Sequence, residues 1–221
     1  MLGKQVDGIV MMSDHVTDKI ASAIRQSPVP VVLAGSIIND SSIPSVNIDY
    51  FQAAMDAIQL FINKGHKEIA FVSGPLEYTI NGEHKLGAYK QALQQANIEI
   101  NEQLIDATDG TYDEALLSWE SFVQKAHVPT AIFAGSDEIA LGIIHAIQDA
   151  GKRVPEDVEV ISFENSKLAR MIRPQLTSVA LPLYDIGAVS MRLLTKLLNK
   201  EEVPDKNVIL PYRIETRKST K

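Results

Sequence analysis

Short apolar runs alternate with amphipathic segments along the chain, most clearly between Thr130 and Asn165. Residues 130–134 predict a strand, the Gly-Ser-Asp turn at 135–137 offers helix-capping side chains, and apolar residues then recur at helical spacing up to Ala150. A second buried-type strand is predicted over 158–163. Because a crossover of this length joins parallel strands, we expect both strands to end at the same edge of one sheet.

The rest of the chain shows the same alternation. We expect further strands over 7–12, 30–34, 45–49, 68–73, 104–107, 178–181, 208–210 and 212–216, and further helices over 17–26, 53–64, 83–95, 113–125 and 184–199. This alternation predicts an α/β fold with parallel sheets. No repeat, low-complexity segment or Pro-rich linker marks a domain boundary.

Polar side chains follow several of the predicted strands. Ser73, Ser136 and Glu164 each end or follow a buried-type strand, and ligands bind at the carboxyl edge of open α/β sheets. Asp14 and Ser36 end two earlier strands and are expected to face them across a cleft. Such a set suits a hydroxylated or phosphorylated small molecule. The simpler interpretation is that Ser136 or Asp137 only caps its helix and that Glu164 is an exposed loop acid.

The predicted helix over 184–199 has two different faces. Its inward face is expected to contain Ile186, Ser190, Leu193 or Leu194, and Leu197. Arg192 and Lys196 lie one turn apart on another face, beside small apolar residues. A phosphoserine brings nearly two negative charges and three acceptor oxygens, which an Arg fork matches well. The alternative is an ordinary solvated basic face near a helix C-terminus.

Composition narrows the classes of function. A net charge of -7 and a pI near 5.2 argue against nucleic-acid binding by this chain itself, since neutralising phosphates requires clustered Lys and Arg. No apolar run approaches the roughly 18 residues that span a membrane. The absence of Cys rules out disulfides and thiolate metal sites, and fits a reducing cytoplasm.

Motifs for catalysis are missing from the sequence. There is no nucleophile elbow, no H-E-x-x-H and no Walker loop, and the five His residues form no i, i+4 ligand pair. His145 is expected to be a solvated or boundary residue of its helix. We therefore predict a cytoplasmic binding protein that is not an enzyme, with no catalytic residue, no metal site and no cofactor.

One long segment, SDEIALGIIHAIQDAGKRVPEDVEVISFEN with RPQLTSV after it, resembles the effector-binding core of the LacI/GalR transcription regulators. The strings SVNIDY, FVSGP, LYDIGAVSMRLLTKLLNK and RIETRKST are similar to the catabolite-control branch of that family. The resemblance implies a two-lobed fold like that of periplasmic binding proteins, with one lobe from 1–50 and 181–212 and the other from 51–180 and 213–221.

The family resemblance also implies a homodimer that binds operator DNA through an N-terminal helix-turn-helix. We find no such motif here, and the chain begins at a point that would lie within the first lobe, so we expect Met1 to start an N-terminally truncated chain. Partner binding across the lobe junction is expected to change the relative pose of the lobes.

By resemblance, four residues would bind the effector: Lys85, Tyr112, Ser136 and Glu164. Three of them depart from the commoner family pattern, because Lys replaces Arg, Ser replaces Asn and Glu replaces Asp. Lys cannot form the planar bidentate fork of Arg. A weakly bound sugar phosphate of the glucose 6-phosphate or fructose 1,6-bisphosphate type, attracted to Lys85, is therefore favoured over a free sugar.

In the catabolite-control branch, a helix similar to 184–199 receives serine-phosphorylated HPr. Carried over by resemblance, Arg192 would grip the phosphate and Lys196 would support it. The remaining contacts would come from Tyr184, Asp185, Val189 and, on the last strand, Arg213. Two rival functions are a sugar-binding receptor of the periplasmic type, which would bind a free pentose or hexose, and an α/β enzyme, which would need a positioned nucleophile and base.

Overall fold

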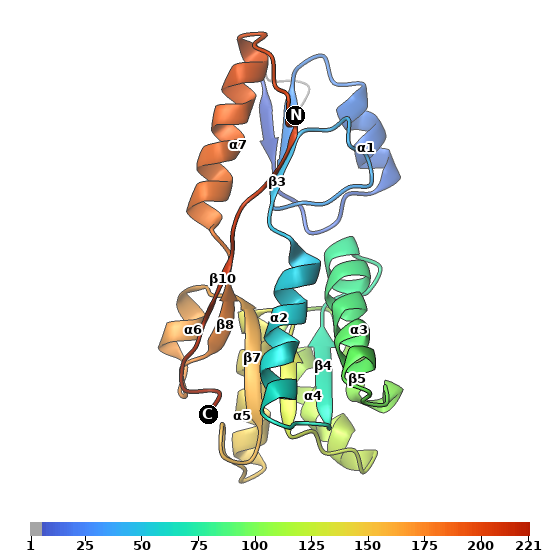
Figure 1. Cartoon of the computed structure of the whole chain (residues 1–221), viewed down its shortest axis with the longest axis vertical. Helices are drawn as coiled ribbons and strands as arrows, with labels where there is room; N and C mark the ends of the chain where they lie inside the picture. The colour runs from blue at the N-terminus through green and yellow to red at the C-terminus, as the bar shows by residue number, and fades with distance from the viewer. Residues whose placement is uncertain (1–5) are drawn as a thin grey trace. The chain divides into compact units, whose positions relative to one another are not determined.

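The computed structural model describes residues 6–221, which divide into two α/β units (Figure 1). Unit 1 comprises Met1–Asp49 and Pro182–Pro211, and unit 2 comprises Tyr50–Leu181 and Tyr212–Lys221. The lobe boundaries expected from the resemblance differ from these by one residue at each crossing. Met1, expected as the start of a truncated chain, lies outside the described residues.

Unit 1 is built on a parallel sheet with the strand order β1-β2-β3-β9. Its helices α1 and α7 lie on opposite sides of this sheet (Figure 1). On α7, Ile186, Leu193 and Leu194 pack in one cluster with Val32 and other apolar residues of the sheet, which confirms the predicted inward face. The elements are β1 (Ile9–Met11), α1 (Asp18–Arg25), β2 (Val31–Ala34), β3 (Ser45–Asn47), α7 (Leu183–Leu198) and β9 (Asn207–Ile209).

Unit 2 is built on a larger sheet with the strand order β10-β8-β7-β6-β4-β5. Its strands are parallel, as predicted, except that β10 runs antiparallel to β8 at one edge. The strands are β4 (Ile69–Ser73), β5 (Ile105–Ala107), β6 (Ala131–Ala134), β7 (Glu159–Glu164), β8 (Thr177–Ala180) and β10 (Arg213–Glu215).

Helices cover both faces of the unit 2 sheet. α2 (Tyr50–Asn63) and α3 (Gly87–Gln95) lie on one face, and α4 (Tyr112–Gln124) and α5 (Asp137–Asp149) lie on the other (Figure 1). Successive strand residues therefore enter different cores. The ring of Phe71 lies tilted against that of Tyr89 in α3, with centroids 5.4 Å apart, whereas its neighbours Ala70 and Val72 pack with α4 and α5. Burial on both faces explains why the strands are almost continuously apolar.

Two predicted helix starts were wrong, and one short helix was not predicted. The helix expected over 83–95 begins earlier, as the π-helix η1 (Ile80–Leu86) that leads into α3, and α2 begins at Tyr50 rather than at residue 53. The short helix α6 (Lys167–Met171) was not predicted, because five residues are too few to show a helical period. Its signal was Ser166, whose Oγ accepts a hydrogen bond from Leu168 N at 3.2 Å.

Candidate functional site

The carboxyl ends of β4, β6 and β7 lie side by side in unit 2, because these strands are neighbours and parallel. Ser73 ends β4 and lies against Gly135, which follows β6: a Cβ at position 135 would come within 2.3 Å of Ser73 Oγ. Position 135 therefore requires glycine. Ser73 Oγ is fully buried and has no hydrogen-bond partner among the described residues. The strand ends that carry Ser73, Ser136 and Glu164 are thus neighbours within unit 2, and the Ser73 side chain is buried among them.

Lys85 brings a positive charge to this edge from η1. Its Nζ donates hydrogen bonds to Gly135 O at 2.8 Å and to Asn81 Oδ1 at 3.2 Å, and it lies 4.6 Å from the centroid of the Phe163 ring. The residue is only 6% exposed. A buried ammonium group is costly unless it has such partners. The family resemblance implied a cation here, but not that it turns inward onto a backbone carbonyl.

Ser136 uses its side chain within the protein. Its Oγ accepts a hydrogen bond from Ile139 N at 3.1 Å and so caps α5, as in the simpler of the two interpretations. The neighbouring Asp137 is fully buried and accepts hydrogen bonds from Ser162 Oγ, Ser178 Oγ and Ser166 N, at 2.6, 3.1 and 2.5 Å. Asp137 therefore ties the start of α5 to β7, to β8 and to the loop before α6.

Glu164 ends β7 in a backbone conformation that is rare for residues other than glycine. Its φ is 113° and that of Asn165 is 57°. Conformations of this kind cost about 1–3 kcal/mol and tend to occur at functional sites. Glu164 is half-buried, so it is not the exposed loop acid of the simpler interpretation. Asn165 is held by Arg217, whose Nη2 donates to Asn165 Oδ1 at 2.6 Å.

Tyr112 begins α4 and contacts α5. Its hydroxyl lies 2.9 Å from Nδ1 of His145, and the two rings are edge-to-face with centroids 5.7 Å apart. Its backbone N donates to Glu138 Oε1 at 3.2 Å. Gly142 makes this approach possible, since a Cβ there would lie 2.6 Å from Tyr112 O. His145 is half-buried, as predicted for a boundary residue, but its bond to Tyr112 was not foreseen.

The polar residues at two strand ends of unit 1 differ from each other. Asp14 is exposed, whereas Ser36 is fully buried. Ser36 Oγ accepts a hydrogen bond from Ser13 N at 2.8 Å, so its side chain serves the packing of unit 1. The prediction that Ser36 offers its hydroxyl to a cleft was wrong, because this hydroxyl is used internally.

The outer face of α7 carries the residues predicted to meet a phosphoprotein. Tyr184 is 86% exposed, Arg192 and Lys196 are exposed, and Val189 is half-buried. Within residues 6–221, neither Arg192 nor Lys196 lies within 4.0 Å of an acidic group. Both line a small groove of about 210 Å³, whose other lining residues are Val189, Leu193, Val203, Pro204, Asp205 and Val208.

Arg213, the sixth residue predicted to contact the partner, belongs to β10 of unit 2. Its side chain is 76% exposed and forms an ion pair with Glu215 two residues later. Because the guanidinium side of this pair is largely solvated, the pair contributes little to stability. Arg213 is therefore held only weakly by Glu215.

Comparison with known proteins identifies the family. Residues 58–220 match a family model described as a periplasmic binding protein-like domain. Over all 221 residues the chain is 54% identical to catabolite control protein A of Priestia megaterium, of which it covers 67%, and 46% identical to that of Staphylococcus xylosus, of which it covers 66%. The chain belongs to the LacI/GalR family of transcription regulators. It spans about two thirds of the length of these relatives.

Solved structures agree with this membership of the LacI/GalR family. The transcription regulator CcpA of Lactococcus lactis superposes with a TM-score of 0.92 at 42% identity, over 100% of this chain and 80% of that one. A sugar-binding LacI-family regulator from Escherichia coli, complexed with phosphate, has a TM-score of 0.84 at 28% identity, over 96% of this chain and 76% of that one. The predicted fold and the prediction of a regulator core rather than an enzyme are confirmed.

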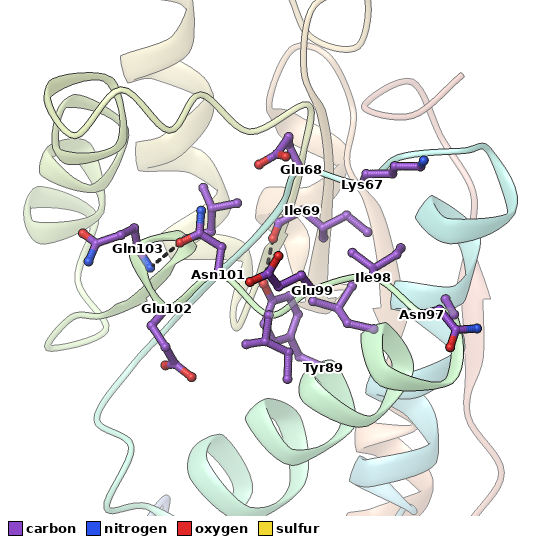
Figure 2. A pocket seen from close by; sticks show the side chains of 14 residues that line it. Lys67, Glu68, Ile69, Tyr89, Asn97, Ile98, Glu99, Asn101, Glu102 and Gln103 are labelled. Atoms are coloured by element: carbon purple, nitrogen blue, oxygen red, sulfur yellow. Dashed lines mark hydrogen bonds between the residues drawn. The ribbon is translucent and has the colours of Figure 1, made fainter.

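A separate cavity of about 590 Å³ opens in unit 2 of this LacI/GalR core (Figure 2). It lies at the amino edge of the sheet, since its lining includes Lys67–Ile69 at the start of β4 and residues 101–104 before β5. Tyr89 forms part of it, and its hydroxyl donates to Ile69 O at 2.8 Å (Figure 2). Burial raises the pKa of the Tyr89 phenol. Sequence reasoning missed this cavity, because nothing in the local pattern marks it.

Residues 6–221 were also compared with the requirements of a membrane-spanning helix and of a metal site. No helix among them is both long enough and apolar enough to cross a bilayer. No group of three or more His, Cys, Asp or Glu side chains among them is placed to hold a metal ion.

Proposed function

We propose that this LacI/GalR core regulates carbon catabolite control by binding serine-phosphorylated HPr on the outer face of α7. The observation that carries the proposal is the pair Arg192 and Lys196, which are exposed, one helical turn apart and free of acidic neighbours within 4.0 Å in the described part of the chain. Relatives that are 54% and 46% identical are named catabolite control protein A, which supports the same branch of the family.

The chemistry of α7 suits a phosphoserine. The planar guanidinium of Arg192 can donate two parallel hydrogen bonds to phosphate oxygens, and the ammonium of Lys196 adds a second charge. Neither group has to leave an internal carboxylate first. Tyr184, Asp185 and Val189 would supply the surrounding contacts, and Arg213 would join by leaving its half-buried partner Glu215.

Sugar phosphates of the glucose 6-phosphate or fructose 1,6-bisphosphate type would act as modulators at the carboxyl edge of the unit 2 sheet. Lys85 would attract the phosphate, and Glu164, Tyr112 and Ser136 would contribute polar contacts. The whole protein would act in the cytoplasm as a homodimer and bind operator DNA through a segment outside this chain. The acidic balance of the chain, with a net charge of -7, supports assigning DNA binding elsewhere.

Calorimetry with HPr tests this proposal. We expect this chain to bind HPr carrying phosphoserine and to bind unphosphorylated HPr at least tenfold more weakly, since charge-assisted hydrogen bonds to the phosphate would be lost. Arg192→Ala should abolish the preference for phosphorylated HPr. Lys19→Ala, which removes an exposed lysine from α1, is the matched control and should leave it unchanged.

Equal affinity of the parent chain and Arg192→Ala for phosphorylated HPr would reject the α7 site. Micromolar binding of a free pentose or hexose, together with no binding of phosphorylated HPr, would favour a sugar receptor of the periplasmic type instead.

A further inference from the structure

Lys85 is held by residues from three different parts of unit 2. Gly135 O, after β6, accepts one hydrogen bond from Nζ, Asn81 Oδ1 accepts another, and the ring of Phe163 in β7 faces the charge. A cation over an aromatic ring is stabilised most when both are removed from water. At 6% exposure, Lys85 meets this condition. Its inward position therefore satisfies the charge within the protein.

Asn81 is the contact that fixes this position from the same helix. It lies four residues before Lys85 in η1, on the wide turn of a π-helix, which places both side chains on one side. Its amide has two roles, because Oδ1 accepts from Lys85 while Nδ2 donates to Pro75 O at 3.3 Å. Pro75 belongs to the turn after β4. Asn81 thus links the lysine to the strand ends that form the candidate effector site.

The surroundings of Asn81 leave little freedom for its amide. A Cβ at Gly74 would come within 3.1 Å of Asn81 Nδ2, so the chain passes close to the side chain on that side. Asn81 is itself half-buried. With Nδ2 bonded to Pro75 O, Oδ1 remains directed at the ammonium group of Lys85.

We infer that Asn81 is a positioning residue that keeps Lys85 retracted, and that the cost of releasing this lysine sets the affinity of the site for a phosphate group. The inference rests on the effector role proposed above for this edge of the sheet. A phosphate gains the charge of Lys85 only when Nζ leaves its internal partners. The apparent affinity for a ligand is the intrinsic affinity multiplied by the fraction of molecules in the binding-competent state, here the state with Lys85 released. A retracted lysine therefore weakens phosphate binding without altering any residue that contacts a sugar ring.

Chemical labelling of the ligand-free chain tests whether Asn81 holds the lysine. We expect acetic anhydride to acetylate Lys85 at least about tenfold more slowly than exposed Lys19, because only an accessible amine reacts. Asn81→Ala should speed the acetylation of Lys85 about tenfold, which corresponds to about 1.4 kcal/mol, near the lower end of what a hydrogen bond to a charged group contributes. Asn81→Asp is the matched control: its carboxylate keeps an acceptor beside Nζ and should keep the reaction slow. Mass spectrometry of the modified peptides gives both rates.

Titration with glucose 6-phosphate and with glucose tests whether releasing Lys85 raises the affinity for a phosphate group. Asn81→Ala should bind glucose 6-phosphate about three- to tenfold more tightly than the parent chain and should leave glucose binding unchanged. In a Lys85→Met background, Asn81→Ala should have no effect.

Several results would overturn the inference. Unchanged acetylation of Lys85 in Asn81→Ala would show that Asn81 does not hold the lysine. Weaker glucose 6-phosphate binding in Asn81→Ala would show that Asn81 contacts the ligand directly. If Asn81→Ala speeds acetylation but no variant binds glucose 6-phosphate, the retracted lysine stands and the proposed effector function fails.

Discussion

The two units present the same chemical groups in opposite surroundings. In unit 1, Arg192 and Lys196 lie exposed on α7 with no acidic group within 4.0 Å among the described residues. In unit 2, Lys85 is 6% exposed and is bound to a backbone carbonyl, an amide and an aromatic face. The two cations of α7 face solvent, whereas the ammonium group of Lys85 already has partners within the protein.

This difference follows from the place of each side chain in the fold. An outward-facing helical residue stays in contact with water, so its charge remains solvated and can pair with an incoming dianion. At the carboxyl edge of a parallel sheet, strand-end carbonyls such as Gly135 O offer acceptors to any nearby donor. A buried charge must use them, because an unpaired one would cost several kcal/mol. Exposed cations are thus available at once, whereas a buried cation has to be released.

The largest expected effect is on partner binding and separates the two regions. Arg192→Ala combined with Lys196→Ala should weaken binding of phosphorylated HPr at least about 100-fold, since truncating hydrogen-bonded charges at an interface costs about 2–5 kcal/mol. Lys85→Met should change that affinity less than about twofold, because its internal partners lie within unit 2. Calorimetry at one fixed salt concentration measures both. Comparable losses in the two variants would contradict the proposed division of roles.

The free energy of unfolding should depend more on Lys85 than on Arg192, which reverses the order expected for partner binding. Lys85→Ala should lower the free energy of unfolding by about 2–3 kcal/mol, because it leaves Gly135 O and Asn81 Oδ1 without their donor. Arg192→Ala should change it by less than about 0.5 kcal/mol, as is usual for an exposed residue. Urea unfolding followed by circular dichroism measures both variants. Equal destabilisation would mean that Arg192 has internal partners in solution.

The sequence predicts the exposed cations of α7 much better than the surroundings of Lys85. Amphipathic spacing on α7 fixes which residues pack inward, so the exposure of Arg192 and Lys196 follows from the buried Ile186 and Leu193. The direction of Lys85 depends on Gly135, 50 residues further along the chain, and on a π-helical turn that no local pattern announces. Only the family resemblance placed this cation at the sheet edge, and it could not tell that the side chain turns inward.

Ser136 and Asp137 show the same limit within one turn. The turn at 135–137 offered both residues as helix caps and Ser136 also as a ligand, and the capping role of Ser136 needs only local geometry. The role of Asp137 depends on Ser162 and Ser178, which reach it from two other strands. Tertiary hydrogen bonds of this kind leave no trace in the spacing of nearby residues.

A smaller effect concerns backbone strain beside Lys85. Glu164→Gly should be about 1 kcal/mol more stable than Glu164→Ala, because glycine adopts a φ of 113° without the cost that a Cβ imposes. Both changes remove the carboxylate equally, so the difference isolates the backbone. Urea unfolding of the two variants measures it. Equal stability would show that the chain at residue 164 relaxes easily, and that unit 2 stores no strain at the candidate effector site.

The smallest effect concerns Tyr112 and His145, a half-buried polar pair that lies between the two extremes. Tyr112→Phe keeps the edge-to-face ring contact and removes only the hydroxyl, 2.9 Å from His145 Nδ1, so it should cost about 0.5–1 kcal/mol of stability. In a His145→Leu background the same change should cost nothing, since the partner is already gone. Thermal unfolding of the four chains gives this coupling. A coupling near zero would show that the Tyr112 hydroxyl is as well solvated as the exposed groups of α7. A coupling well above 1 kcal/mol would show that it is shielded from water as Lys85 is, because a hydrogen bond gains strength as its surroundings exclude water.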